Sequence, residues 1–272
     1  MIEEAGGPIE YDACGSGATV VLVPGSCSTG AAWRPVIAAW QNRFRCVTTA
    51  LPGYGQTMER RSAADPSVHR NAETVEAVIR KAGGPVHLVG HSFGGLVSLA
   101  VALRDRVALL SLTMVEAPAV EVVREENRHY RAFRDMTACY FSNVAAGKAD
   151  AIATMIDFYG GAGTFAAWPP KLRAYAIATT AVNILDWAGA YGFPLPAARL
   201  AKLHIPLLVV GGADSPAAMQ RVAALLHERV AGSVLATIKG AAHFMIASHA
   251  SELAELIASH VQRAEAEPSV AA

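Results

Sequence analysis

Hydrophobic positions along the chain form two alternating patterns. Short apolar runs rich in β-branched residues are typical of strands that are buried on both faces of a parallel sheet. Between several of these runs lie longer stretches whose apolar residues recur at helical spacing. The pattern predicts strands at 18–23, 45–49, 86–89, 110–115, 207–210 and 234–238, and helices at 74–81, 93–104, 216–230 and 250–262. This alternation predicts an α/β fold with a mostly parallel sheet.

The segment from Ala119 to Leu200 interrupts the alternation. It contains helical patterns, aromatic and glycine clusters and no convincing strand. We therefore expect a helical insertion at 119–200, set into a core that is formed by residues 1–118 and 201–272.

Composition narrows the classes of function. The 272 residues carry 23 basic and 23 acidic side chains, so the chain lacks the positive charge typical of a nucleic-acid binder. The acidic start and the absence of long apolar runs argue against a secretory signal and a membrane span. The four cysteines show neither CxxC pairs nor zinc-ligand spacing. We expect a cytoplasmic protein that acts on a small molecule without a metal or cofactor, and we leave a homodimer open.

The strongest chemical signal is the segment Gly90-His91-Ser92-Phe93-Gly94-Gly95, which joins a predicted strand to a predicted helix. A nucleophile on a sharp strand-to-helix turn has a strained backbone, so the residues two positions away on either side must be small. Gly90 and Gly94 meet this requirement, and the segment therefore predicts Ser92 as a nucleophile.

A serine nucleophile needs a base, and the base needs a carboxylate that orients it. His243 follows the last predicted strand in a loop of small residues, where a parallel sheet places its ligands. Asp214 follows the strand at 207–210 and is the favoured carboxylate. Glu116 follows the strand at 110–115 and is the alternative, because both carboxylates could reach the same crevice.

Hydrolysis at a carbonyl also needs fixed donors for the oxygen that becomes negative. The backbone N–H of Phe93, at the start of a helix, is one expected donor. The loop after the first central strand should supply the other, with Ser26 preferred over Cys27.

Together these residues resemble the α/β-hydrolase fold superfamily. The similarity comprises Ser92 in Gly-His-Ser-Phe-Gly-Gly, Asp214 in Gly-Gly-Ala-Asp and His243 in Gly-Ala-Ala-His-Phe, in the chain order of that superfamily. It implies an eight-stranded, mostly parallel sheet that is flanked by helices, with residues 119–200 as a helical cap over the site. Two positions depart from the superfamily: Pro24 replaces a common His, and Ala50-Leu51 replaces a common Asp before Pro-Gly.

The resemblance implies a serine hydrolase that cleaves a small, largely apolar carboxylic ester or lactone through an acyl-enzyme on Ser92. Two alternatives use the same fold. One is an enzyme with other chemistry, either carbon–carbon bond hydrolysis or cofactor-independent oxygenation. The other is a ligand receptor with slow turnover. The motifs do not choose among these functions, and they do not identify the substrate.

Overall fold

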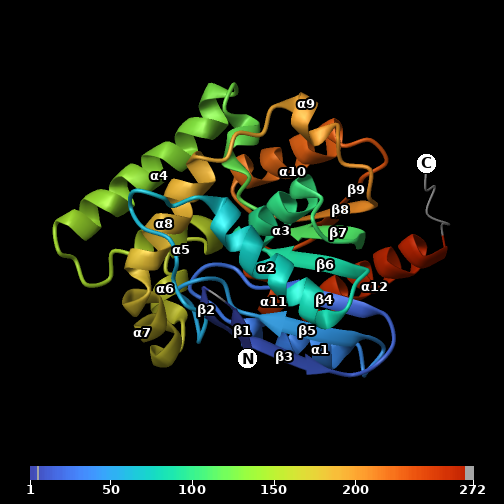
Figure 1. The fold of residues 1–272 in the computed structure, drawn as a ribbon. Helices are drawn as coiled ribbons and strands as arrows, with labels where there is room; N and C mark the ends of the chain where they lie inside the picture. Colours follow the sequence, from blue (N-terminus) through green and yellow to red (C-terminus); the bar gives the residue numbers. More distant parts are fainter. Residues whose placement is uncertain (5, 267–272) are drawn as a thin grey trace.

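The computed structural model describes residues 1–4 and 6–266 and is built around a seven-stranded sheet (Figure 1). The order in the sheet is β3-β5-β4-β6-β7-β8-β9, and β1 and β2 pair separately. The strands are β1 (Ile2–Glu4), β2 (Gly7–Ile9), β3 (Tyr11–Cys14), β4 (Thr19–Val23), β5 (Arg45–Thr49), β6 (Val86–His91), β7 (Leu109–Val115), β8 (Leu207–Gly212) and β9 (Val234–Ile238).

The pairing within the sheet is parallel except at one edge, where β3 runs antiparallel to β5. The sheet has seven strands in place of the expected eight. Ile2 of β1 lies opposite Ile9 of β2 in a small antiparallel ladder of its own. The N-terminal residues thus pair with each other and do not extend the sheet.

Alternate residues of the central strands face opposite layers, as the period of two in a strand requires. Val21 and Val23 of β4 belong to one hydrophobic cluster, whereas Val20 and Leu22 belong to a second cluster on the other face. The first face is covered by α2 (Val68–Ala82), α3 (Phe93–Arg104) and α10 (Ala217–Arg229). The second face is covered by α1 (Arg34–Ala39), α11 (Met245–Ser248) and α12 (Ala250–Ala266).

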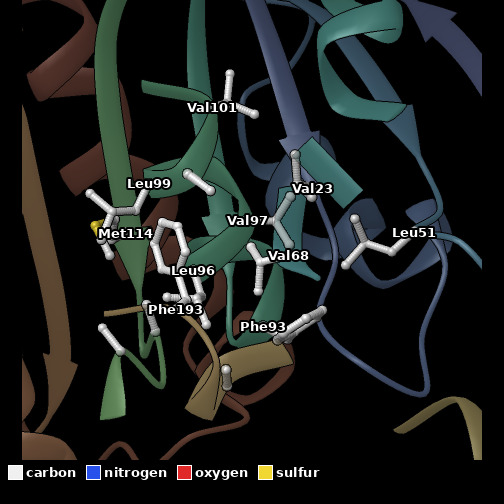
Figure 2. Packing of buried hydrophobic residues seen from close by; sticks show 14 of the residues in the cluster. Val23, Leu51, Val68, Phe93, Leu96, Val97, Leu99, Val101, Met114 and Phe193 are labelled. Atoms are coloured by element: carbon white, nitrogen blue, oxygen red, sulfur yellow. The ribbon is translucent and has the colours of Figure 1, made fainter. Parts of the chain in front are cut away.

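Helix α3 follows β6 directly and is apolar on nearly all sides, so it is buried against the sheet. Figure 2 shows Leu96 and Val97 of this helix among side chains that include Val23 of β4 and Met114 of β7. This packing fixes the N-terminal end of α3 against the ends of the central strands.

The helical insertion, residues 119–200, contains six α-helices, and none of its residues lies in a strand. They are α4 (Asn127–Ala145), α5 (Ala153–Gly160), α6 (Thr164–Ala167), α7 (Pro170–Ala178), α8 (Thr180–Tyr191) and α9 (Ala197–Leu200). Figure 1 shows α4 to α8 gathered on one side of the molecule, beside the sheet. Phe133 and Trp187 of the insertion belong to the same hydrophobic cluster as Val23 and Leu96. The insertion and the sheet therefore share a core.

Candidate active site

Ser92 lies at the turn between β6 and α3 with φ 53° and ψ −131°, which is a strained conformation for a residue with a side chain. Its N–H donates to the carbonyl of Val115, 2.8 Å away. A Cβ on Gly90 would overlap the carbonyl of Gly94, and a Cβ on Gly94 would overlap the carbonyl of Pro24. The two glycines are required because backbone atoms pass this close to the turn.

The structure brings His243 to this serine. His243 follows β9, is buried, and its Nε2 lies 2.9 Å from the Oγ of Ser92. The ring of Tyr159, from α5, stacks on the imidazole with centroids 4.1 Å apart. A buried imidazole at hydrogen-bond distance is placed to accept the serine proton.

The carboxylate beside His243 belongs to Glu116, which follows β7. Its Oε2 lies 3.3 Å from Nδ1 of His243, and its Oε1 accepts from the N–H of Gly212 at 2.7 Å. Glu116 has a positive φ of 49°, so the chain turns sharply after the strand. With Nδ1–H donating to the carboxylate, Nε2 is left as the acceptor that faces Ser92.

Among the described residues, Asp214 forms no hydrogen bond with His243, and the carboxylate of Glu116 lies beside the imidazole instead. The backbone N–H of Asp214 donates to the carbonyl of Ala241, and its side chain is exposed. Strand β8 continues through Gly212, so the turn that follows carries Asp214 outward, while Glu116 fills the space beside the imidazole. Sequence position alone favours Asp214, which differs from the structure because the turn after each strand is not evident in the sequence.

The loop after β4 runs directly beside the nucleophile. A Cβ on Gly25 would lie 2.8 Å from the Cβ of Ser92. Ser26 and Phe93 both line the cavity next to this point. The Oγ of Ser26 donates to the carboxylate of Asp186 at 2.5 Å, so this hydroxyl is already engaged. The backbone N–H groups of Ser26 and Phe93 therefore remain the candidate donors for an oxyanion.

His91 supports the loop that carries the base. Its Nε2 donates to the carbonyl of His243 at 2.8 Å. Burial, together with the nearby His243, lowers the pKa of His91 to about 3. His91 is thus neutral at ordinary pH and acts as a fixed hydrogen-bond donor.

A cavity of about 930 Å³ opens above Ser92 and His243, and its walls are mostly apolar. The core contributes residues 25–29 and 91–93, and the insertion contributes Met155, Tyr159 and Trp187. A cavity of this size is within the range of sites for small molecules.

A buried polar cluster beside the cavity has no signal in the sequence. Asp186 of α8 accepts from Ser26, from the hydroxyl of Tyr54 at 2.6 Å and from Nη1 of Arg61 at 2.6 Å. Burial raises the pKa of Asp186, and the charge of Arg61 with the hydroxyl donors offsets part of that rise. Glu59 also pairs with Arg61, at 2.7 Å. Ser26 and Asp186 are 160 positions apart in the sequence, so only the fold brings them together.

Neither a cluster of metal-ligand side chains nor a membrane-spanning helix is found in the part of the chain that the structure describes. Residues 1–4 and 6–266 contain no group of three His, Cys, Asp or Glu side chains that could hold a metal ion. Among the same residues, no helix combines the length and the apolar character that crossing a bilayer requires.

A model of the alpha/beta hydrolase family matches residues 20–256 of this chain. The chain belongs to that family. The match includes the strands and loops that carry Ser92, Glu116 and His243, and the observed sheet is the mostly parallel one that this family implies.

Named relatives of this alpha/beta hydrolase match only part of it. A pimeloyl-(acyl-carrier protein) methyl ester esterase from Aeromonas hydrophila subsp. hydrophila is 30% identical over 118 residues, which are 43% of this chain and 45% of that protein. A (E)-2-((N-methylformamido)methylene)succinate hydrolase from Acinetobacter baylyi is 30% identical over 90 residues, 33% of this chain and 34% of that protein. The chain thus matches less than half the length of these relatives.

A solved structure extends the likeness to nearly the whole fold. The thermophilic esterase from Thermogutta terrifontis superposes with a TM-score of 0.71 at 20% identity, covering 94% of this chain and 93% of that one. Identity at this level shows a common fold alone.

Proposed function

We propose that this chain is a serine hydrolase that cleaves a small, largely apolar carboxylic ester or lactone through an acyl-enzyme on Ser92. The observation that carries the proposal is the line from Ser92 through His243 to Glu116, which borders an apolar cavity. Nucleophile, base and orienting carboxylate occur in the geometry that acyl transfer requires.

In the first half of the reaction, Oγ of Ser92 attacks the substrate carbonyl while Nε2 of His243 takes its proton. The carbonyl oxygen becomes negative, and the N–H groups of Phe93 and Ser26 stabilise it. Glu116 stabilises the imidazolium through Nδ1. The carbon–oxygen bond then breaks, and His243 returns the proton to the leaving alcohol.

In the second half, His243 removes a proton from water, and the hydroxide attacks the acyl-enzyme. As the second tetrahedral intermediate collapses, the bond between the acyl carbon and Oγ of Ser92 breaks and His243 returns the proton to Oγ, which releases the carboxylic acid and restores the serine hydroxyl. The closed ring of a lactone follows the same steps, with the alcohol remaining attached to the acid.

The walls of the cavity support an apolar substrate. Tyr159, Trp168 and Trp187 of the insertion line it, so we propose that the insertion acts as the cap over the site. The name of the Aeromonas relative, a methyl ester esterase, agrees with ester chemistry.

A test combines a fluorophosphonate probe with a panel of nitrophenyl esters. Wild type should be labelled and should hydrolyse at least one ester, whereas Ser92→Ala should lose labelling and nearly all turnover. Ser251→Ala, which changes an exposed serine on α12, is the matched control and should behave as wild type. Equal labelling of Ser92→Ala and wild type would refute the proposal. A labelled serine without turnover of any ester would favour carbon–carbon hydrolysis, oxygenation or a receptor.

A further inference from the structure

Helix α8 presents one face to the cavity, and the side chains on this face make different interactions. Asn183, Asp186, Trp187 and Ala190 all line the cavity. Asp186 accepts three hydrogen bonds, and Trp187 stacks on Tyr159, which in turn covers His243. Asn183 lies one helical turn before both of them, roughly 5–6 Å away along the same face.

The side chain of Asn183 is buried, with 1% of its surface exposed, and it hydrogen-bonds to no other described residue. Its Oδ1 is wholly enclosed, and turning the amide over would leave Nδ2 unpartnered in its place. A buried polar side chain without a protein partner destabilises a fold, and Asn183 both lacks such a partner and lines the cavity.

The other buried polar side chains that line the cavity already have partners or another task, and the lining cations Arg34 and Lys171 are exposed to solvent. His91 donates to the carbonyl of His243, and the hydroxyl of Tyr175 accepts from the N–H of Gly55 at 2.9 Å. The hydroxyl of Tyr159 also lacks a partner, but its ring is stacked on the catalytic imidazole. Asn183 is therefore the polar side chain of α8 that is left for a substrate.

We infer that Asn183 is a hydrogen-bonding subsite for a secondary amide in the acyl chain of the substrate. An asparagine side chain offers one acceptor and one donor group in a plane. A secondary amide offers both an N–H and a C=O, so it can pair with whichever end of the Asn183 amide faces the cavity. This inference rests on the proposed ester hydrolysis and narrows its substrate to esters or lactones that carry an amide.

Three pairs of probes test the inference. They are the nitrophenyl esters of N-acetylglycine, N-acetyl-β-alanine and N-acetyl-4-aminobutyrate, each compared with the alkanoate ester of equal chain length. The pairs vary the distance between the amide and the scissile carbonyl. Each is assayed with wild type and with Asn183→Leu, which has nearly the same shape and no polar atom.

Wild type should favour one N-acetyl ester over its alkanoate partner by about tenfold or more in kcat/KM, because the analogue leaves Asn183 unpaired. Asn183→Leu should lose this preference, so that its kcat/KM for the N-acetyl ester falls to about that for the alkanoate of equal chain length. The melting temperature of Asn183→Leu should equal or exceed that of wild type, because the substitution removes an unpaired buried group.

Two results would overturn the inference. One is a wild type that prefers the alkanoate in every pair, and the other is an Asn183→Leu variant that keeps the amide preference. Failure of the proposed function is separate, since it would abolish alkanoate turnover and the labelling of Ser92 in wild type.

Discussion

Glu116 and Asp214 follow neighbouring strands of the sheet, and the local backbone determines which one reaches His243. The positive φ of Glu116 turns its side chain toward the imidazole, and the N–H of Gly212 holds one carboxylate oxygen. Asp214 lies two residues beyond the end of β8 and is exposed. The neighbouring strands thus bring both carboxylates to the same edge of the sheet, and the backbone at single residues determines which one contacts His243.

This assignment predicts a contrast between two amide variants. Glu116→Gln should lower kcat by about a thousandfold or more, because the amide does not stabilise the imidazolium and can favour the wrong tautomer. Asp214→Asn should stay within about threefold of wild type, since its side chain is exposed. Steady-state kinetics on the best nitrophenyl ester measure both. A strong loss in Asp214→Asn beside an active Glu116→Gln would contradict the placement.

A second prediction concerns buried histidines and pH. His87 is fully buried, and burial with the nearby His260 lowers its pKa to about 4. The unfolded chain binds a proton at His87 below about pH 6.5, whereas the folded chain stays neutral until about pH 4. The free energy of unfolding should therefore fall on acidification, with about 2 kcal/mol from His87 between pH 7 and pH 5.

His87→Gln tests this contribution because glutamine does not titrate. Urea unfolding at several pH values measures the free energy of unfolding. Between pH 7 and pH 5, this free energy should fall about 2 kcal/mol less in His87→Gln than in wild type. An identical pH dependence in the two proteins would contradict the buried, neutral state of His87.

The site shows which residue-level features a sequence can predict. The surroundings of Ser92 and His243 are local, a strand end and small residues, so both side chains could be named in advance. Asp186 and Arg61 carry no such signal, because their contacts join α8 to loops more than a hundred residues away in the sequence.

At the scale of elements, the content of apolar and β-branched residues explains which strands could be predicted. The six predicted strands are the inner strands β4 to β8 and the edge strand β9, which is mostly exposed but has the sequence Val-Leu-Ala-Thr-Ile. Strand β3 is largely exposed, so it has no apolar run to reveal it. The separate β1–β2 ladder replaces the eighth strand, and a ladder of three pairs leaves little pattern in the sequence.

The turn between β6 and α3 packs closely against the loop after β4, and substitution of Gly94 tests this contact. Gly94→Ala would force the loop after β4 away from Ser92, because the new methyl group overlaps the carbonyl of Pro24. We expect a loss of stability of about 1–3 kcal/mol and a loss of kcat of at least tenfold. Chemical denaturation and ester kinetics provide the two measurements.

Gly84→Ala is the matched control for Gly94→Ala. Its added Cβ would lie 3.5 Å from the nearest atom, the carbonyl of Ala108, which is an ordinary contact. Alanine there should be neutral or stabilising by up to about 1 kcal/mol, with unchanged kcat. A Gly94→Ala variant that behaves like this control would show that the loop has room to accommodate the methyl group.

At the scale of the whole molecule, the helical insertion is joined to the sheet in two ways. Its apolar side chains share a core with β4 and α3, and Asp186 forms a buried ion pair with Arg61, from the loop after β5. The same Asp186 holds Ser26 beside the nucleophile. The position of the insertion and the shape of the candidate oxyanion loop are therefore coupled through one carboxylate.

Breaking the Arg61–Asp186 pair should weaken the whole fold and not the insertion alone. Arg61→Met leaves a buried carboxylate without a positive partner, and such a loss costs about 3–5 kcal/mol. For a chain of this size that corresponds to a fall in Tm of about 6–20 °C. Calorimetry should still show a single transition, because the insertion and the sheet share a core. Arg70→Met removes a half-exposed pair with Asp65 and should cost about 0–1 kcal/mol. A separate transition for the insertion, or equal shifts in the two variants, would contradict this coupling.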